Sequence, residues 1–172
     1  MEKNIVLIGF MGTGKSSVGM KLAQKLKRQF VDMDKEIERI TGLSVSNIFK
    51  LHGEIRFRSE EKLLSGKLAC QSGLVIATGG GVVLEQENID VLRRNGILIC
   101  LQAGAQEIFE RVSRRRGTRP LLKKDLRLED IEDMLKARES FYAQARYQVN
   151  TSHKSPEQVS NEIIGLLKNS ER

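Results

Sequence analysis

The chain has 172 residues, of which 40% are hydrophobic and 30% charged, and its formal net charge is +7. This length and composition predict a soluble globular protein and exclude a disordered chain. No apolar run approaches the roughly 20 residues of a membrane span, and a strand is expected almost at the first residue instead of a signal peptide. We therefore expect a cytoplasmic protein that binds no membrane, with Cys70 and Cys100 as small buried side chains.

Strands and helices are expected to alternate along the whole chain. The strands are predicted near residues 4–8, 30–33, 74–78, 97–101 and 147–150. The helices are predicted near residues 15–27, 34–41, 45–51, 54–71, 85–94, 105–115, 128–145 and 156–168. Ser155, Pro156 and Gln158 form a clear start signal for the last helix. Such alternation predicts a parallel sheet with helices on both faces, a three-layer α/β/α fold, in one domain over residues 1–172.

The first expected strand leads into residues 9–16, GFMGTGKS, which fit the phosphate-binding pattern G-x-x-x-x-G-K-S and are called the P-loop below. Glycines let backbone N–H groups face phosphate oxygens, the lysine reaches the β- and γ-phosphates, and the serine hydroxyl can ligate Mg²⁺. A glycine-rich turn is the alternative, but the flanking strand and helix favour a nucleotide site. We predict that ATP is bound by Gly12, Thr13, Gly14, Lys15, Ser16 and Ser17.

Two aspartates, Asp32 and Asp34, follow the second expected strand. Residues two apart on a strand point to the same side, which here is the ligand crevice at the carboxyl end of the sheet. One carboxylate can organise magnesium and the other can meet an acceptor hydroxyl; capping of the next helix is the alternative. The third strand, 74–78, does not end in the aspartate of a typical Walker B strand. Asp32 is therefore the better candidate, with Ser16, for the magnesium shell.

Three further features suit an anionic acceptor. Gly79, Gly80 and Gly81 follow the third strand and allow close approach of a ligand, although a tight turn is the alternative. Arg58 and Glu61 are spaced to pair on a helix, which would orient the guanidinium for capture of a carboxylate. A surface ion pair is the simpler interpretation of this spacing, and Arg138 has the same ambiguity.

Two segments are expected to move or to bind substrate. Residues 114–126 are rich in charge and contain Gly117 and Pro120, a composition typical of a lid. The run of arginines from 111 to 119 favours a phosphate-handling loop over a general nucleic-acid surface. Residues 34–63 are expected to form short helices after the second strand. At this place a doubly wound sheet can carry a substrate-binding region.

In combination, these residues resemble the shikimate kinase family, and the likeness covers nearly the whole chain. It is carried by the P-loop, Asp32-Met33-Asp34, Gly53-Glu54, Phe57-Arg58 with Glu61, Gly79-Gly80-Gly81, Arg119-Pro120-Leu121-Leu122, and Arg138 with Tyr142. The resemblance implies a five-stranded parallel sheet of order 2-3-1-4-5 with a lid and substrate-binding helices. It also implies transfer of a phosphoryl group from ATP to the 3-hydroxyl of shikimate, with Mg²⁺, giving shikimate 3-phosphate and ADP in aromatic amino-acid biosynthesis.

The resemblance also implies roles for single residues. Asp34 would bind the ring hydroxyls of shikimate, and Arg58 and Arg138 would hold its carboxylate. Lys15 and Arg119 would stabilise phosphoryl transfer. The remaining implied contacts are Gly79, Gly80 and Gly81 in the acceptor pocket, Ser16 and Asp32 on Mg²⁺, and Lys154 on the adenine side. One departure concerns Arg138: Ser140 stands where the family usually has proline, and Ala145 comes one residue early, so this helix is expected to end early or shifted.

Three other functions fit parts of the sequence. A gluconate-type kinase would share the P-loop and lid, but not the Arg58 segment or the three glycines. A GTP-dependent switch would need an Asn-Lys-x-Asp sequence, which this chain lacks, and a Walker B aspartate. A nucleic-acid-binding module would account for the charge of +7. We expect instead a monomer that binds ATP and shikimate and no nucleic acid.

Overall fold

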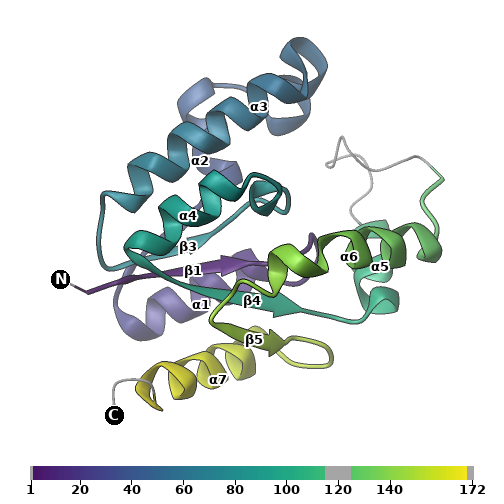
Figure 1. Cartoon of the computed structure of the whole chain (residues 1–172). Coiled ribbons are helices and arrows are strands. Elements are labelled where there is room, and N and C mark those ends of the chain that lie inside the picture. The colour runs from purple at the N-terminus through teal and green to yellow at the C-terminus, as the bar shows by residue number, and fades with distance from the viewer. Residues whose placement is uncertain (1, 115–124, 170–172) are drawn as a thin grey trace.

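A computed structural model describes residues 2–114 and 125–169 and is built around one five-stranded sheet (Figure 1). All neighbouring strands are parallel, and their order is β2-β3-β1-β4-β5. The strands are β1 (Asn4–Ile8), β2 (Gln29–Asp32), β3 (Leu74–Ala77), β4 (Gly96–Gln102) and β5 (Tyr147–Asn150). The predicted sheet and strand order are therefore confirmed.

Helices cover both faces of this sheet (Figure 1). They are α1 (Lys15–Leu26), α2 (Met33–Thr41), α3 (Val45–Ala69), α4 (Gln86–Arg94), α5 (Ala105–Ser113), α6 (Leu128–Tyr142) and α7 (Pro156–Asn169), with a short 3₁₀ turn, η1 (Val82–Leu84). Ile5 and Leu7 of β1 face the core that contains α1 and α7, whereas Val6 and Ile8 face the core formed with the other helices. This alternation is the period of two that a strand buried on both faces requires.

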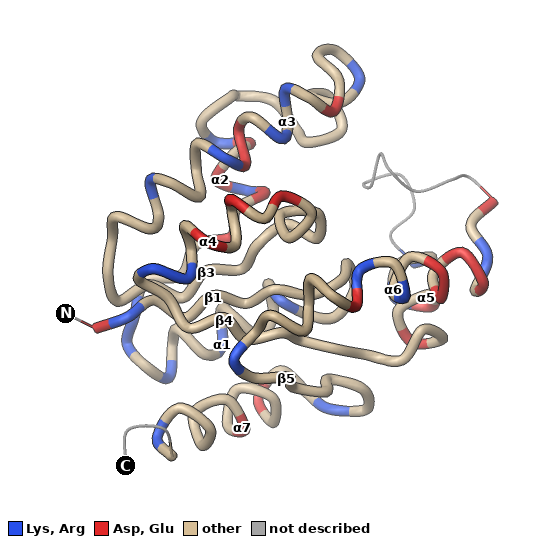
Figure 2. Tube along the Cα trace, viewed as in Figure 1, with Lys and Arg blue, Asp and Glu red and all other residues tan. Residues whose placement is uncertain are grey.

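Charged residues lie mainly outside these cores. Figure 2 shows lysine, arginine, aspartate and glutamate along the helices, whereas β1, β3 and β4 carry none. Asp32, at the end of β2, is the one strand residue with a charge among the described strands. Within the described ranges, none of the helices combines the length and apolarity needed to cross a membrane.

Several details differ from the sequence prediction. The helices predicted at 45–51 and 54–71 form one element, α3, which is interrupted at Gly53 by the non-helical angles φ 79° and ψ 174°. Asp34 lies on α2, inside the predicted helix 34–41, but the strand geometry that was expected to align it with Asp32 does not apply, because β2 ends at Asp32 and α2 begins at Met33. The prediction that both cysteines are buried was wrong for Cys70, which is exposed because it follows the last turn of α3 at the surface; Cys100 is buried in β4.

The end of α6 and the start of α7 agree with expectation. Helix α6 ends at Tyr142, three residues before the predicted end, as the shifted family pattern implied. At the start of α7 the Ser155 hydroxyl accepts from the Gln158 N–H at 3.2 Å, and the Gln158 side chain accepts from the Ser155 N–H at 2.8 Å. The predicted capping box is thus present.

Asn4 joins the beginning of β1 to the connection between α3 and β3. Its side chain is 1% exposed. The amide Nδ2 donates to the Gln71 carbonyl at 2.9 Å and the Leu68 carbonyl at 3.3 Å, and Oδ1 accepts from the Leu74 N–H at 2.9 Å. One buried side chain therefore satisfies three backbone groups of another segment.

We predict that Asn4→Ala lowers the free energy of unfolding by about 1–3 kcal/mol, because the buried Leu74 N–H would lose its side-chain acceptor and the Leu68 and Gln71 carbonyls would each lose one donor. Urea denaturation followed by circular dichroism measures this value. Asn161→Ala on the exposed surface of α7 is the control and should shift the midpoint little. An unchanged midpoint in Asn4→Ala would show that water replaces the amide at no cost.

Candidate active site

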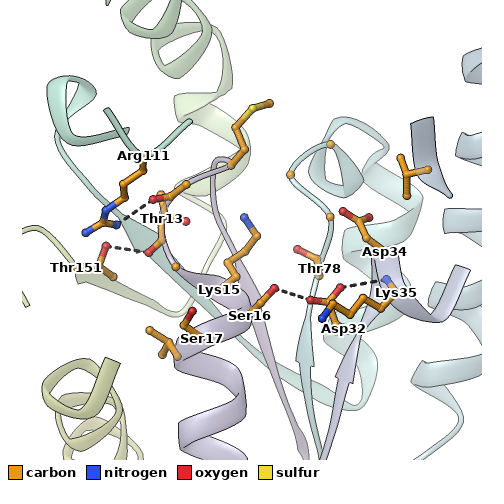
Figure 3. A pocket seen from close by; sticks show the side chains of 18 of the residues that line it. Thr13, Lys15, Ser16, Ser17, Asp32, Asp34, Lys35, Thr78, Arg111 and Thr151 are labelled. Carbon is orange, nitrogen blue, oxygen red and sulfur yellow. Dashed lines mark hydrogen bonds between the residues drawn. The ribbon is translucent and has the colours of Figure 1, made fainter. Parts of the chain in front are cut away.

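A cleft of about 630 Å³ lies at the carboxyl ends of the central strands, beside the P-loop. Figure 3 shows a close view of the side chains that line it. Every predicted site residue that the structure describes lines this cleft: Gly12, Thr13, Gly14, Lys15, Ser16, Ser17, Asp32, Asp34, Arg58, Gly79, Gly80, Gly81, Arg138 and Lys154. Arg119 and the greater part of the predicted lid, 114–126, lie outside the described residues.

The P-loop connects β1 to α1 in a conformation that its glycines make possible. Gly12 and Gly14 have φ angles of 79° and 92°, which residues with a Cβ atom rarely adopt. The Lys15 side chain is buried and turns back over the loop, where Nζ donates to the carbonyl oxygens of Gly9 at 2.7 Å and Phe10 at 2.9 Å. The ammonium group is therefore held among the backbone atoms that would surround a bound phosphate.

Ser16 and Asp32 meet on one side of the P-loop (Figure 3). The Ser16 hydroxyl donates to Asp32 Oδ2 at 2.5 Å, and Asp32 Oδ1 accepts from the Lys35 N–H at 3.3 Å. Asp32 thus caps α2, as the alternative interpretation predicted, and it also lines the cleft; its place in the magnesium shell stays a prediction. Over the described residues, no group of three or more His, Cys, Asp or Glu side chains could hold a metal ion by itself.

The triple-glycine turn (Gly79, Gly80 and Gly81) is crowded by side chains of the protein. A Cβ atom on Gly79 would stand 2.7 Å from Asp34 Oδ1 and 3.0 Å from Glu61 Oε1. On Gly81 it would stand 2.4 Å from Arg58 Nη1. Close approach, not turn geometry, therefore explains these two glycines, and the atoms that approach belong to α2 and α3.

Arg58 is held between two glutamates. Nη1 donates to Glu61 Oε2 at 2.6 Å, and Nη2 donates to Glu54 Oε1 at 3.2 Å. The predicted pairing with Glu61 is therefore present, but it is not a surface ion pair, because the Glu61 side chain is 1% exposed. Burial raises the pKa of Glu61 to about 7, although Arg58 opposes this shift, and the nearby charges of Asp34 and Glu54 add to it.

Arg138 reaches the same turn from α6. Its side chain is buried, Nη1 donates to the Gly80 carbonyl at 3.0 Å, and its guanidinium carbon lies 5.0 Å from the centre of the Phe10 ring. Among the described residues it has no carboxylate partner within ion-pair distance. A buried guanidinium without a carboxylate partner is costly away from water, because its charge is not compensated. The site around Arg138 therefore favours an anionic ligand.

Among the cleft residues that were not predicted from the sequence, two bind carbonyl groups of the P-loop. Arg111 Nη1 donates to the Gly12 carbonyl at 2.9 Å, and the Thr151 hydroxyl donates to the Thr13 carbonyl at 2.9 Å (Figure 3). Arg111 was visible only as part of a basic run. Thr151 stands in no pattern that would have marked it, because its contact is made across 138 residues of sequence.

Comparison with known proteins agrees with this geometry. A sequence model described as shikimate kinase matches residues 11–168. The chain belongs to the shikimate kinase family. A curated shikimate kinase of Pelotomaculum thermopropionicum is 51% identical over 166 residues, which cover 96% of each chain.

Solved shikimate kinase structures share the fold of this family member. The structure of the enzyme from Acinetobacter baumannii in complex with shikimate has a TM-score of 0.94 and 34% identity, covering 99% of this chain and 95% of that one. The structure from Aquifex aeolicus has a TM-score of 0.83 and 32% identity, with 98% of each chain covered.

The raised pKa of Glu61 makes the stability of this shikimate kinase family member depend on pH. Between about pH 4.5 and 7 the folded protein holds a proton on Glu61 that the unfolded chain has released, so the free energy of unfolding falls as pH rises. Glu61→Gln cannot titrate. We predict that the variant gains about 3 kcal/mol relative to the natural protein over this window.

Chemical denaturation of both proteins between pH 4.5 and 8 tests this prediction. The difference between their free energies of unfolding should increase with pH up to about 7 and then level off. A difference that stays constant, or that decreases, would mean that Arg58 keeps Glu61 ionised throughout.

Proposed function

We propose that the protein transfers the γ-phosphoryl group of ATP to the 3-hydroxyl of shikimate, giving shikimate 3-phosphate and ADP. One observation carries this proposal: the P-loop and the triple-glycine turn, with its two arginines, line one cleft. The family match and the likeness to a shikimate kinase solved in complex with shikimate support it. We further propose that the protein acts as a cytoplasmic monomer in aromatic amino-acid biosynthesis, without nucleic-acid or membrane partners.

The donor side of the reaction belongs to the P-loop. Gly12, Thr13 and Gly14 would surround the phosphates of ATP with backbone N–H groups, and Ser17 and Lys154 would lie beside the nucleotide. Lys15 donates to two neutral carbonyls in the structure. Phosphate oxygens would replace these partners with charge-assisted hydrogen bonds, which are stronger. The same ammonium would then stabilise charge on the transferred group.

Ser16 and Asp32 would hold Mg²⁺ directly or through water. Their oxygens already meet at 2.5 Å on the cleft wall, and hydroxyl and carboxylate oxygens are ligands that this small, hard ion accepts. Two protein oxygens are enough, since Mg²⁺ usually keeps several waters and binds phosphate as well. The ion would supply electrostatic stabilisation of the phosphates.

The acceptor side belongs to the triple-glycine turn and to helices α2 and α3, which make up most of the proposed substrate-binding region, 34–63. Arg58 and Arg138 would hold the carboxylate of shikimate, one oriented by two glutamates and the other buried against Phe10. Asp34 would bind the ring hydroxyls and orient the attacking oxygen. Fixing both reactants in this way supplies most of the catalysis that phosphoryl transfer needs.

The proposed lid and Arg119 lie outside the described residues, so their roles rest on the family resemblance. Closure of 114–126 would bring Arg119 to the transferred phosphate. It would also exclude water, which otherwise competes with shikimate as the acceptor.

A coupled assay of ADP release tests the proposed function. The protein is mixed with ATP, Mg²⁺ and, in separate reactions, shikimate, gluconate or nucleoside monophosphates. We expect turnover with shikimate only, and a loss of about a hundredfold or more in Lys15→Ala, because a contact to the reacting phosphate is removed. Turnover with gluconate but not shikimate would contradict the proposal.

The two arginines generate a separate prediction about the acceptor. Arg58→Ala and Arg138→Ala should each raise the KM for shikimate strongly and the KM for ATP little, because their proposed partner is a carboxylate. Steady-state kinetics with shikimate and with an analogue lacking the carboxylate separate this role from a structural one. The analogue should be far less sensitive to either substitution. Arg56→Ala, which removes an exposed arginine from the same helix, is the control.

A further inference from the structure

The Thr151 side chain connects the loop after β5 to the P-loop, within the cleft. Thr151 directly follows β5 and is 3% exposed. Its hydroxyl oxygen lies 2.9 Å from the Thr13 carbonyl oxygen of the P-loop and 3.0 Å from the Gln102 carbonyl oxygen at the end of β4. A hydroxyl has a single proton to donate, and the Gln102 carbonyl already has a backbone donor, so the proton is available to Thr13. The Thr151 N–H also donates to Gln102, at 2.7 Å. Thr151 is thus anchored on the sheet by its backbone and on the P-loop by its hydroxyl.

The bond to Thr13 fixes the orientation of one peptide group. A peptide is planar and trans, so its carbonyl and the following N–H point in opposite directions. In Figure 3 Thr151 lies on one side of Thr13 and Lys15 on the other. A Thr13 carbonyl held toward Thr151 therefore directs the Gly14 N–H toward the Lys15 side of the cleft. Because Gly14 has no side chain and a φ of 92°, this peptide needs such an external contact to stay in one orientation.

The loop that begins at Thr151 is itself held firmly. The Gly104 N–H donates to the Ser152 hydroxyl at 2.9 Å, the Ser152 N–H donates to the Asn150 side chain at 2.8 Å, and the Lys154 N–H donates to the Thr151 carbonyl at 3.2 Å. Lys154 and Pro156, further along, line the same cleft. A shift of this loop would therefore be transmitted through the Thr151 hydroxyl to the P-loop.

We propose that Thr151 is a positioning residue for the nucleotide. Its hydroxyl holds the Thr13–Gly14 peptide with the Gly14 N–H facing the phosphates, and so links the phosphate end of the site to the loop that carries Lys154. This inference rests on the proposed binding of ATP in the cleft. Arg111 holds the preceding peptide through the Gly12 carbonyl, but from α5 instead of from this loop.

The test compares Thr151→Val, which keeps the shape but removes the hydroxyl, with Thr151→Ser, which keeps the hydroxyl. Calorimetry measures the affinity for ADP, and steady-state kinetics measure the KM for ATP and for shikimate. We expect Thr151→Val to weaken ADP binding and raise the KM for ATP roughly five- to thirtyfold, the effect of one lost buried hydrogen bond. The KM for shikimate should stay within about twofold, and Thr151→Ser should restore the natural values.

The split between ATP and shikimate distinguishes positioning from general damage to the fold. An equal rise of both KM values, unchanged ADP affinity in Thr151→Val, or failure of Thr151→Ser to restore affinity would each overturn the inference. Thr151→Ala, which cannot clash, replaces the valine variant if that one does not fold. The control is Asn95→Ala, because Asn95 also binds a distant carbonyl, that of Gln71, but at the amino end of β4.

The binding measurement separates this inference from the proposed function. If the natural protein binds ADP but does not phosphorylate shikimate, the proposed function fails while the calorimetric comparison still decides the role of Thr151.

Discussion

Close packing against the triple-glycine turn is the constraint on which the acceptor half of the cleft depends. Asp34, Glu61 and Arg58 approach its backbone so closely that a Cβ atom on Gly79 or Gly81 would overlap them. Arg138 donates to the carbonyl of the glycine between these two. Four charged side chains from three helices thus use one turn as a common support. The turn itself is placed by β3, which ends at Ala77, two residues before Gly79.

The charged side chains around the triple-glycine turn are partly or fully buried. Glu61 is buried beside Asp34, and the positive charge of Arg58 offsets part of the repulsion between the two carboxylates. Burial and Asp34 together raise the pKa of Glu61, and a protonated Glu61 does not repel Asp34. A buried set of this kind adds little stability, since desolvation offsets much of the attraction. What it supplies is orientation: the guanidinium of Arg58 has two acceptors on its own helix and therefore one preferred direction.

The sequence allowed the parallel sheet and the P-loop to be predicted, because these features depend on local patterns. A short β-branched strand, a glycine loop and an amphipathic helix follow each other within the first 26 residues, and the family resemblance supplied the strand order. Prediction was weaker wherever burial or contact between distant residues decides the outcome. The spacing of Arg58 and Glu61 predicted their ion pair, but it did not predict that the Glu61 side chain is buried. The predicted helix 34–41 contained Asp34, but strand periodicity could not align it with Asp32, because β2 ends one residue before α2 begins at Met33.

The contact between Thr151 and the P-loop could not be predicted from the sequence either, because it joins residues far apart in the chain. A threonine after a strand is common, and only the closed sheet brings it beside the P-loop. The reason for the three glycines was likewise hidden, since the atoms that require them come from Asp34, Arg58 and Glu61, which are 18 or more residues earlier. Patterns in a sequence identify residues suited to a chemistry, whereas the packing that orients them appears only in three dimensions.

The contact between β5 and the P-loop has a consequence for how the protein is made. The phosphate-binding residues are synthesised long before the hydroxyl that holds them, because Thr151 follows Thr13 by 138 residues. Strand β5 and helix α7, which packs against α1, also follow the other described elements in the chain. A nascent chain thus carries a complete P-loop sequence, without the contact that holds it, until Thr151 has been made. We therefore expect nucleotide to stabilise the fold fully only after β5 has been made, so that earlier intermediates depend on their own apolar cores.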